Sequence, residues 1–131
     1  MKKLILFSIL FFTTLNVHAK WVFIGEAENV ITFVDTESYK RTGPIVKFWE
    51  LRDYREPRGI RENSKLYLSS KIKTEINCNT EESMMLAIID YSDNSGNGEV
   101  INSFQYNDKQ SRHIVADTLG YAIYKFVCNK K

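Results

Sequence analysis

The stretch that decides the fold is residues 65–78, which read KLYLSSKIKTEINC. From Leu66 to Cys78, every second position carries an apolar or small residue, and the positions between them are mostly polar. Successive side chains of a strand point to opposite faces, so this alternation predicts a strand with one buried face and one wet face. The pattern places Cys78 on the buried face, where another element must pack.

That other element is predicted at the end of the chain, where the hydrophobic period changes. Apolar residues recur at helical spacing at Leu119, Ala122, Ile123 and Phe126. Thr118 or Asp117 can serve as the N-cap. On an ideal helix Cys128 points away from this apolar stripe. Either the helix ends before Cys128, or a second side of the helix also contacts the sheet.

The remaining strands are predicted from runs of β-branched and aromatic residues between turn signals. Residues 84–91 are apolar at both alternating positions, which predicts a central strand covered on both faces. The Gly/Asn cluster at residues 94–98 predicts a hairpin turn. Short turns between successive strands favour antiparallel pairing. We expect an α+β fold, with about six antiparallel strands packed against one C-terminal helix; the other strand ranges are 21–24, 30–34, 45–54 and 99–106.

The first nineteen residues have the pattern of a secretory signal peptide. Two lysines precede an apolar run of about a dozen residues, and Val17 and Ala19 suit the −3 and −1 positions of a cleavage site. A membrane anchor needs about 20 apolar residues, so it is the weaker interpretation. We expect cleavage between Ala19 and Lys20, a single domain over residues 20–131, and export to the periplasm or the outer surface of a bacterial cell.

The two cysteines, Cys78 and Cys128, are the only ones in the chain. An even number of cysteines in an exported protein favours a disulfide. The alternative is a metal site, but there is no CxxC motif and His113 is the only histidine after the signal peptide. We therefore predict that a Cys78–Cys128 disulfide joins the sheet to the helix, and we expect neither a metal nor a cofactor.

Charge argues against a nucleic-acid partner. The full chain has 18 basic and 16 acidic side chains, and two of the lysines lie in the signal peptide, which contains no acid. The exported domain therefore has 16 of each and a formal charge of zero. Proteins that bind nucleic acids through net charge carry a basic excess.

No residue pattern indicates a reaction. His113 lies near Ser111 and Asp117, but the chain has no GxSxG or HExxH motif, and a loop histidine is the simpler interpretation. Three acids flank the glycine-rich turn, Asp90, Asp93 and Glu99, and paired carboxylates could act in acid/base chemistry or hold Ca²⁺. They lack EF-hand spacing, so turn-forming residues are the better interpretation. We expect a protein that is not an enzyme.

The densest basic stretch is residues 52–61, RDYREPRGIR. Arginine and tyrosine are favoured at protein interfaces, and exposed hairpin loops commonly carry binding function. The alternative is a solvated loop, because acidic residues dilute the charge. We predict a partner-binding loop formed by Arg52, Tyr54, Arg55, Arg58 and Arg61.

Several stretches together resemble the surface-adhesin protein E-like family of small exported bacterial proteins. They are residues 34–35, the block GPIVKFWELRDY at 43–54, residues 69–71 leading to Cys78, residues 91–100 with the turn GNGEV, and LGYAIYKFVC at 119–128. The resemblance implies an antiparallel sheet tied to a C-terminal helix by cysteines. It also implies adhesion to host extracellular matrix proteins such as vitronectin and laminin. The alternative is a periplasmic inhibitor or envelope-assembly module without a host ligand. Homodimerisation is left open.

Overall fold

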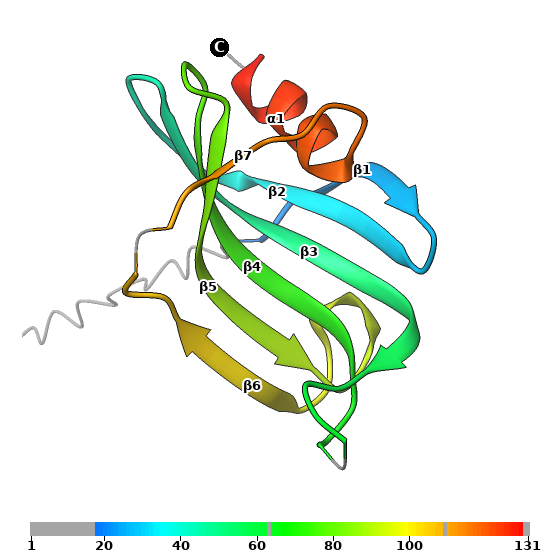
Figure 1. Ribbon diagram of the computed structural model, residues 1–131. Helices are drawn as coiled ribbons and strands as arrows, with labels where there is room; N and C mark the ends of the chain where they lie inside the picture. Colours follow the sequence, from blue (N-terminus) through cyan, green and yellow to red (C-terminus); the bar gives the residue numbers. More distant parts are fainter. Residues whose placement is uncertain (1–17, 63, 109, 130–131) are drawn as a thin grey trace, which may run out of the picture.

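The computed structural model describes residues 18–62, 64–108 and 110–129. An antiparallel sheet curves around one helix (Figure 1). The predicted signal peptide falls mainly on residues 1–17, outside the described residues, so it stays a prediction. The elements are β1 (Trp21–Ala27), β2 (Val30–Thr42), β3 (Ile45–Arg58), β4 (Tyr67–Asn77), β5 (Glu82–Tyr91), the 3₁₀ turn η1 (Asn94–Gly96), β6 (Val100–Gln105), β7 (Arg112–His113) and α1 (Leu119–Cys128).

The sheet is a meander in which each strand pairs with the next along the chain, in the order β1-β2-β3-β4-β5-β6. Every pairing is antiparallel, as short connections between neighbours require. The short strand β7 also pairs with β5, where His113 lies opposite Glu82, beyond the part of β5 that pairs with β6. The predicted fold class is confirmed, and β7 is an addition that the sequence did not predict.

From Ser70 to Ile76, strand β4 confirms the alternation from which its prediction came, but before Ser70 the alternation fails, because Leu66 is 57% exposed and Ser69 is buried. Ser70, Ile72, Thr74 and Ile76 are buried, and the residues between them are half-buried. β3 and β5 flank β4 on its two sides, which places it inside the sheet.

The hydrophobic core lies between α1 and one end of the sheet. Ile123 and Val127 of the helix are buried against sheet residues such as Val34 and Phe48. Thr118 is the N-cap, because its side-chain oxygen accepts a 3.2 Å hydrogen bond from the Tyr121 amide. That bond satisfies one of the amides that a helix start leaves without an intrahelical partner.

The predicted disulfide is confirmed: Cys78 and Cys128 are bonded, with their Cα atoms 5.7 Å apart. The helix continues to Cys128, so it does not end early. Its buried side runs through Ile123 and Val127, and the predicted stripe residues Leu119 and Phe126 are only half-buried. This rotation brings Cys128 toward the sheet.

The predictions for β1, β2, β3 and β5 need correction. β1 ends at Ala27, opposite Val30, and β2 ends at Thr42, opposite Ile45, because backbone pairing continues beyond the apolar runs to each turn. β3 continues to Arg58, which pairs with Tyr67 of β4. β5 is not covered on both faces: Asp90 is its only buried residue. The reason is that the core around α1 involves strands at the other end of the sheet and includes no β5 residue.

Candidate functional site

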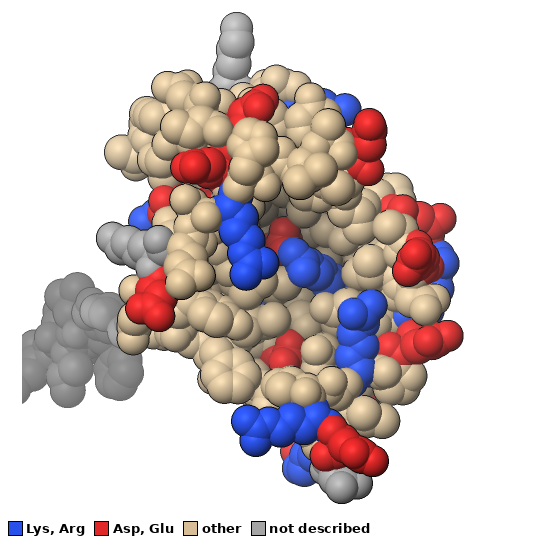
Figure 2. Space-filling model, viewed as in Figure 1, with Lys and Arg blue, Asp and Glu red and all other residues tan. Residues whose placement is uncertain are grey.

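The candidate site is the part of the helix-bearing face of the sheet that α1 leaves uncovered. Figure 2 shows a hollow in the middle of this view, with basic and acidic side chains gathered in and around it. The strand register explains which side chains reach this face. Arg52 lies between Thr32 and Ser70, and Ser70 lies opposite Asp90. Residues paired across strands share a face, so a polar row crosses the sheet here.

The polar row is held by a buried hydrogen-bond network. The Ser70 hydroxyl donates to the Asp90 carboxylate at 2.6 Å, and the Asn102 amide donates to the same carboxylate at 3.3 Å. The Tyr54 hydroxyl donates to the Ser70 hydroxyl oxygen at 3.4 Å. Asp90 is 2% exposed. Burying a carboxylate without partners is costly, so the network fixes these side chains in place.

Next to this row, Glu50 and Arg52 form an ion pair in which the acid is buried and the arginine is partly exposed. The guanidinium donates to the carboxylate at 2.7 Å. The Glu50 side chain is 2% exposed, whereas the Arg52 side chain is 40% exposed. Burial raises the pKa of Glu50, and the charge of and hydrogen bond from Arg52 oppose that rise. The rest of the Arg52 guanidinium is available to solvent.

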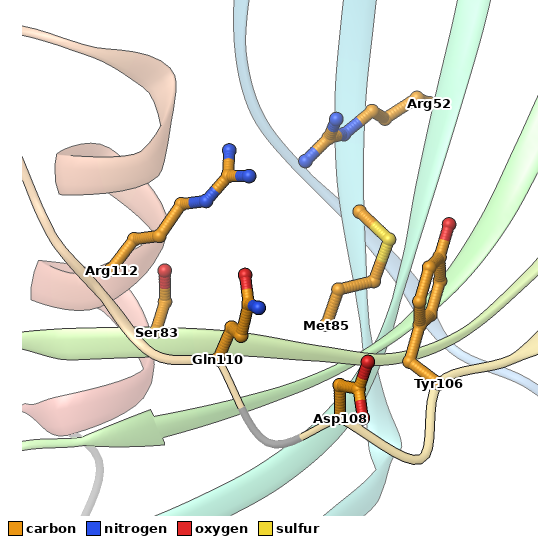
Figure 3. Close-up of a pocket in the computed structure, with 7 residues that line it drawn as sticks. All are labelled: Arg52, Ser83, Met85, Tyr106, Asp108, Gln110 and Arg112. Carbon is orange, nitrogen blue, oxygen red and sulfur yellow. The ribbon is translucent and has the colours of Figure 1, made fainter.

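This face holds a cavity of about 520 Å³, called here the groove. It opens between β3, β5, β7 and the segment that joins β6 to β7. Figure 3 shows the Arg52 and Arg112 guanidinium groups pointing toward each other across it, with Met85 below Arg52. The groove is defined by Arg52, Ser83, Met85, Tyr106, Asp108, Gln110 and Arg112.

A second hollow, of about 290 Å³, lies on the other side of Arg52, beside the N-terminus of α1. Arg58 and Tyr54 line it, and the Arg58 guanidinium carbon lies 4.4 Å from the centre of the Tyr54 ring. Tyr67 packs edge-on against Tyr54 with ring centres 5.8 Å apart. Burial and the nearby Asp90 charge raise the pKa of Tyr67, so this hydroxyl remains protonated at neutral pH.

The predicted basic segment is mostly strand rather than loop, because β3 continues to Arg58. The structure brings Arg52, Tyr54 and Arg58 together on the open face. Arg55 points elsewhere: it pairs with Glu26 and donates to the carbonyl oxygen of residue 28 at 3.1 Å. Arg61 is exposed in the β3–β4 connection and lines neither hollow. The binding role of all five residues stays a prediction.

Sequence reasoning missed the residues that β7 and its preceding segment bring to the groove, Tyr106, Gln110 and Arg112. The pairing of Arg112 with Ser83 carries Arg112 there, and a two-residue strand has no periodicity to detect. Tyr106 is held beside β5 by the hydrogen bond from its amide to the Leu86 carbonyl oxygen. His113 beside them is exposed. Within the described residues, no hydrogen bond joins its side chain to Ser111 or Asp117.

Two further observations bear on the class of protein. Across the described residues, no group of three or more His, Cys, Asp or Glu side chains is arranged to hold a metal ion. In the same part of the chain, no helix is long and apolar enough to span a membrane.

Comparison with known proteins gives one family and one fold. The family model of surface-adhesin protein E matches residues 21–129. Two solved structures of Haemophilus influenzae protein E are similar to this chain. One is 18% identical with a TM-score of 0.61, covering 81% of this chain and 74% of that one; the other is 17% identical with a TM-score of 0.59, covering 81% and 83%. At this identity the likeness shows the fold alone. The comparison with curated protein sequences gives no match.

Proposed function

This chain belongs to the surface-adhesin protein E family, and from that premise we propose that it is an exported, non-enzymatic protein that binds host extracellular matrix proteins. In this proposal the contact is made by the open face of the sheet around Tyr54 and Arg58. The observation that carries it is the Arg58 guanidinium stacked on the Tyr54 ring at the exposed end of β3.

The Arg58–Tyr54 pair presents a guanidinium group of the kind that is favoured at protein interfaces. Tyr54 is 7% exposed and its hydroxyl donates to Ser70, so it is the platform on which Arg58 rests, and the exposed guanidinium supplies the charge and the hydrogen bonds to a partner. Arginine is enriched among the residues that dominate binding energy. The stacking holds the guanidinium in place before a partner arrives, which lowers the ordering cost of binding. Arg58 is exposed and the strand beneath it is hydrogen-bonded into the sheet, so a rigid element presents the pair.

The direct test is solid-phase binding of residues 20–131 to immobilised vitronectin, laminin and other matrix proteins. We expect binding that weakens with added salt and falls in an Arg58→Ala variant. Arg61→Ala is the matched control, because it removes the same charge from a site that lines neither hollow. Equal binding by wild type and Arg58→Ala would remove this face from the proposal, and no binding to any matrix protein would overturn the adhesive function.

The alternative is a periplasmic inhibitor or envelope-assembly module. The two functions differ in where the protein lies in the cell. An adhesin must be accessible from outside, so protease treatment of intact cells should degrade it while a periplasmic marker survives. Full protection of the protein in intact cells, with degradation after the outer membrane is permeabilised, would favour the periplasmic module.

A further inference from the structure

The groove, which lies on the side of Arg52 away from Tyr54 and Arg58, has an excess of hydrogen-bond donors. Arg112 makes no ion pair or side-chain hydrogen bond to any described residue, and its guanidinium faces that of Arg52 (Figure 3). Arg52 uses one nitrogen for Glu50. Each guanidinium carries five N–H donors, so most of these donors have no partner among the described residues. Two like charges directed at each other repel unless an anion lies between them.

Further polar side chains line the groove. The side chains of Ser83, Tyr106 and Gln110 project into the groove in Figure 3. Within the described residues, none of these three side chains makes a hydrogen bond. Met85 lies below Arg52 in this view and supplies an apolar surface. A concave site with an apolar floor and a few convergent polar groups is typical of ligand-binding pockets, and about 520 Å³ lies within their usual size.

We propose that the groove binds one carboxylate, presented by the acidic side chain of an extended peptide segment of a partner protein, between Arg52 and Arg112. The planar guanidinium fork matches a carboxylate bidentately. The Tyr106 ring and Met85 offer contact to the residues that flank the acid. The site does not use Arg58 or Tyr54, so a test of the groove is independent of a test of the proposed matrix contact.

Charge selects a carboxylate over a doubly charged phosphate. Among the described lining residues, Asp108 is acidic and opposes the two arginines. Glu50, directly behind Arg52, offsets part of the Arg52 charge. The net positive charge is therefore small, which suits a single negative charge. Asp108 repels any anion in the groove, and it repels a phosphate dianion about twice as strongly as a carboxylate at the same distance.

The test uses N-acetylated, C-amidated fluorescent pentapeptides with Glu, Gln or phosphoserine at the centre, flanked by Leu and Tyr, and N-acetylglutamate amide as a free small acid. Binding is measured by fluorescence anisotropy for the peptides and by NMR shifts of the arginine Nε–H signals for all four probes. The variants are Arg112→Glu and, as a control with the same change of charge, Arg61→Glu. Arg112 is exposed and lies in the two-residue strand β7, so its replacement leaves the core intact.

We expect the Glu peptide to bind and to shift the Arg52 and Arg112 signals, with affinity reduced roughly tenfold or more by Arg112→Glu and unchanged by Arg61→Glu. The Gln peptide and the free acid should bind much more weakly. Equal binding of the Glu and Gln peptides, or of the Glu peptide to wild type and Arg112→Glu, would overturn the proposal. Tighter binding of the phosphoserine peptide would identify a phosphate site instead, and equal affinity for the free acid would identify a small-acid pocket; either result refutes the peptide assignment.

Discussion

Arg52 donates a 2.7 Å hydrogen bond to the carboxylate of Glu50, two residues earlier on the same face of β3. Glu50 is buried in the sheet, and Arg52 extends from it to both hollows of the open face. A buried acid therefore orients the arginine that lies at the centre of the candidate site. Removing Arg52 would leave the buried Glu50 carboxylate without its charged partner, which is costly, whereas Arg52 without Glu50 would remain in contact with solvent.

The first prediction concerns the pH dependence of stability. Burial raises the pKa of Glu50 above its unfolded value of 4.5, so the folded protein holds this proton more tightly than the unfolded chain. The resulting stabilisation is fully present below the unfolded pKa and is lost as pH rises through the higher folded pKa. Relative to Glu50→Gln, which cannot ionise, the wild type should lose unfolding free energy as pH rises from about 4 to 8.

Urea denaturation monitored by tryptophan fluorescence at a series of pH values measures this difference. Glu37→Gln, an exposed position on β2, is the control and should track the wild type at every pH. A wild-type curve parallel to that of Glu50→Gln over the whole range would contradict the prediction.

The second prediction concerns the Cys78–Cys128 bond, which closes a loop with a sequence separation of 50 residues. By the chain-entropy relation, a loop of this size stabilises the folded state by up to about 4 kcal/mol. A Cys78→Ser/Cys128→Ser variant should lower the unfolding free energy by about 2–4 kcal/mol. Denatured protein purified without reductant should show no free thiol, and two titratable thiols would show that the bond does not form in the cell.

The third prediction concerns Asp53, which ties the β5–β6 turn to β3. Its carboxylate accepts hydrogen bonds from the Asn94 side chain at 2.7 Å and from the Ser95 amide at 2.9 Å. Ser95 has a φ of 61°, an uncommon conformation for a residue with a side chain, so the turn needs such support. Asp53→Ala should cost about 1–2 kcal/mol and speed hydrogen exchange at the Ser95 amide. Glu56→Ala, near the exposed end of β3, should change neither.

How much of this structure the sequence could predict depends on whether a feature is local. The alternation of residues 65–78 and the helical spacing of residues 119–128 are set by side chains close together in the chain, and both elements were predicted correctly. The end of β3 was not, because residues 55–58 are polar and join the strand by backbone pairing: Arg58 lies opposite Tyr67. Propensity carries little information about such an extension.

The residues of the candidate site also divide into those that local sequence predicts and those that depend on long-range pairing. Arg52 and Tyr54 could be singled out from a dense basic stretch, and their shared face follows from the period of a strand. Arg112 could not, because it is brought to the groove by its pairing with Ser83, 29 positions earlier in the chain. The sequence pattern also could not predict which side of β3 Arg55 and Arg58 point to, because the β3–β4 register shifts between Asp53 and Arg58.

The last prediction separates binding from folding at Arg58. Its guanidinium lies 4.4 Å from the centre of the Tyr54 ring, and an exposed cation–π contact stabilises by about 0.5–1 kcal/mol. Arg58→Ala should therefore reduce the unfolding free energy by no more than about 1 kcal/mol and leave the circular dichroism spectrum unchanged. Because the folded population hardly changes, any larger fall in matrix-protein binding by this variant is the loss of a contact. A stability loss of more than about 2 kcal/mol would instead show that Arg58 supports the β3–β4 end of the sheet, and the binding result could then not be assigned to the interface.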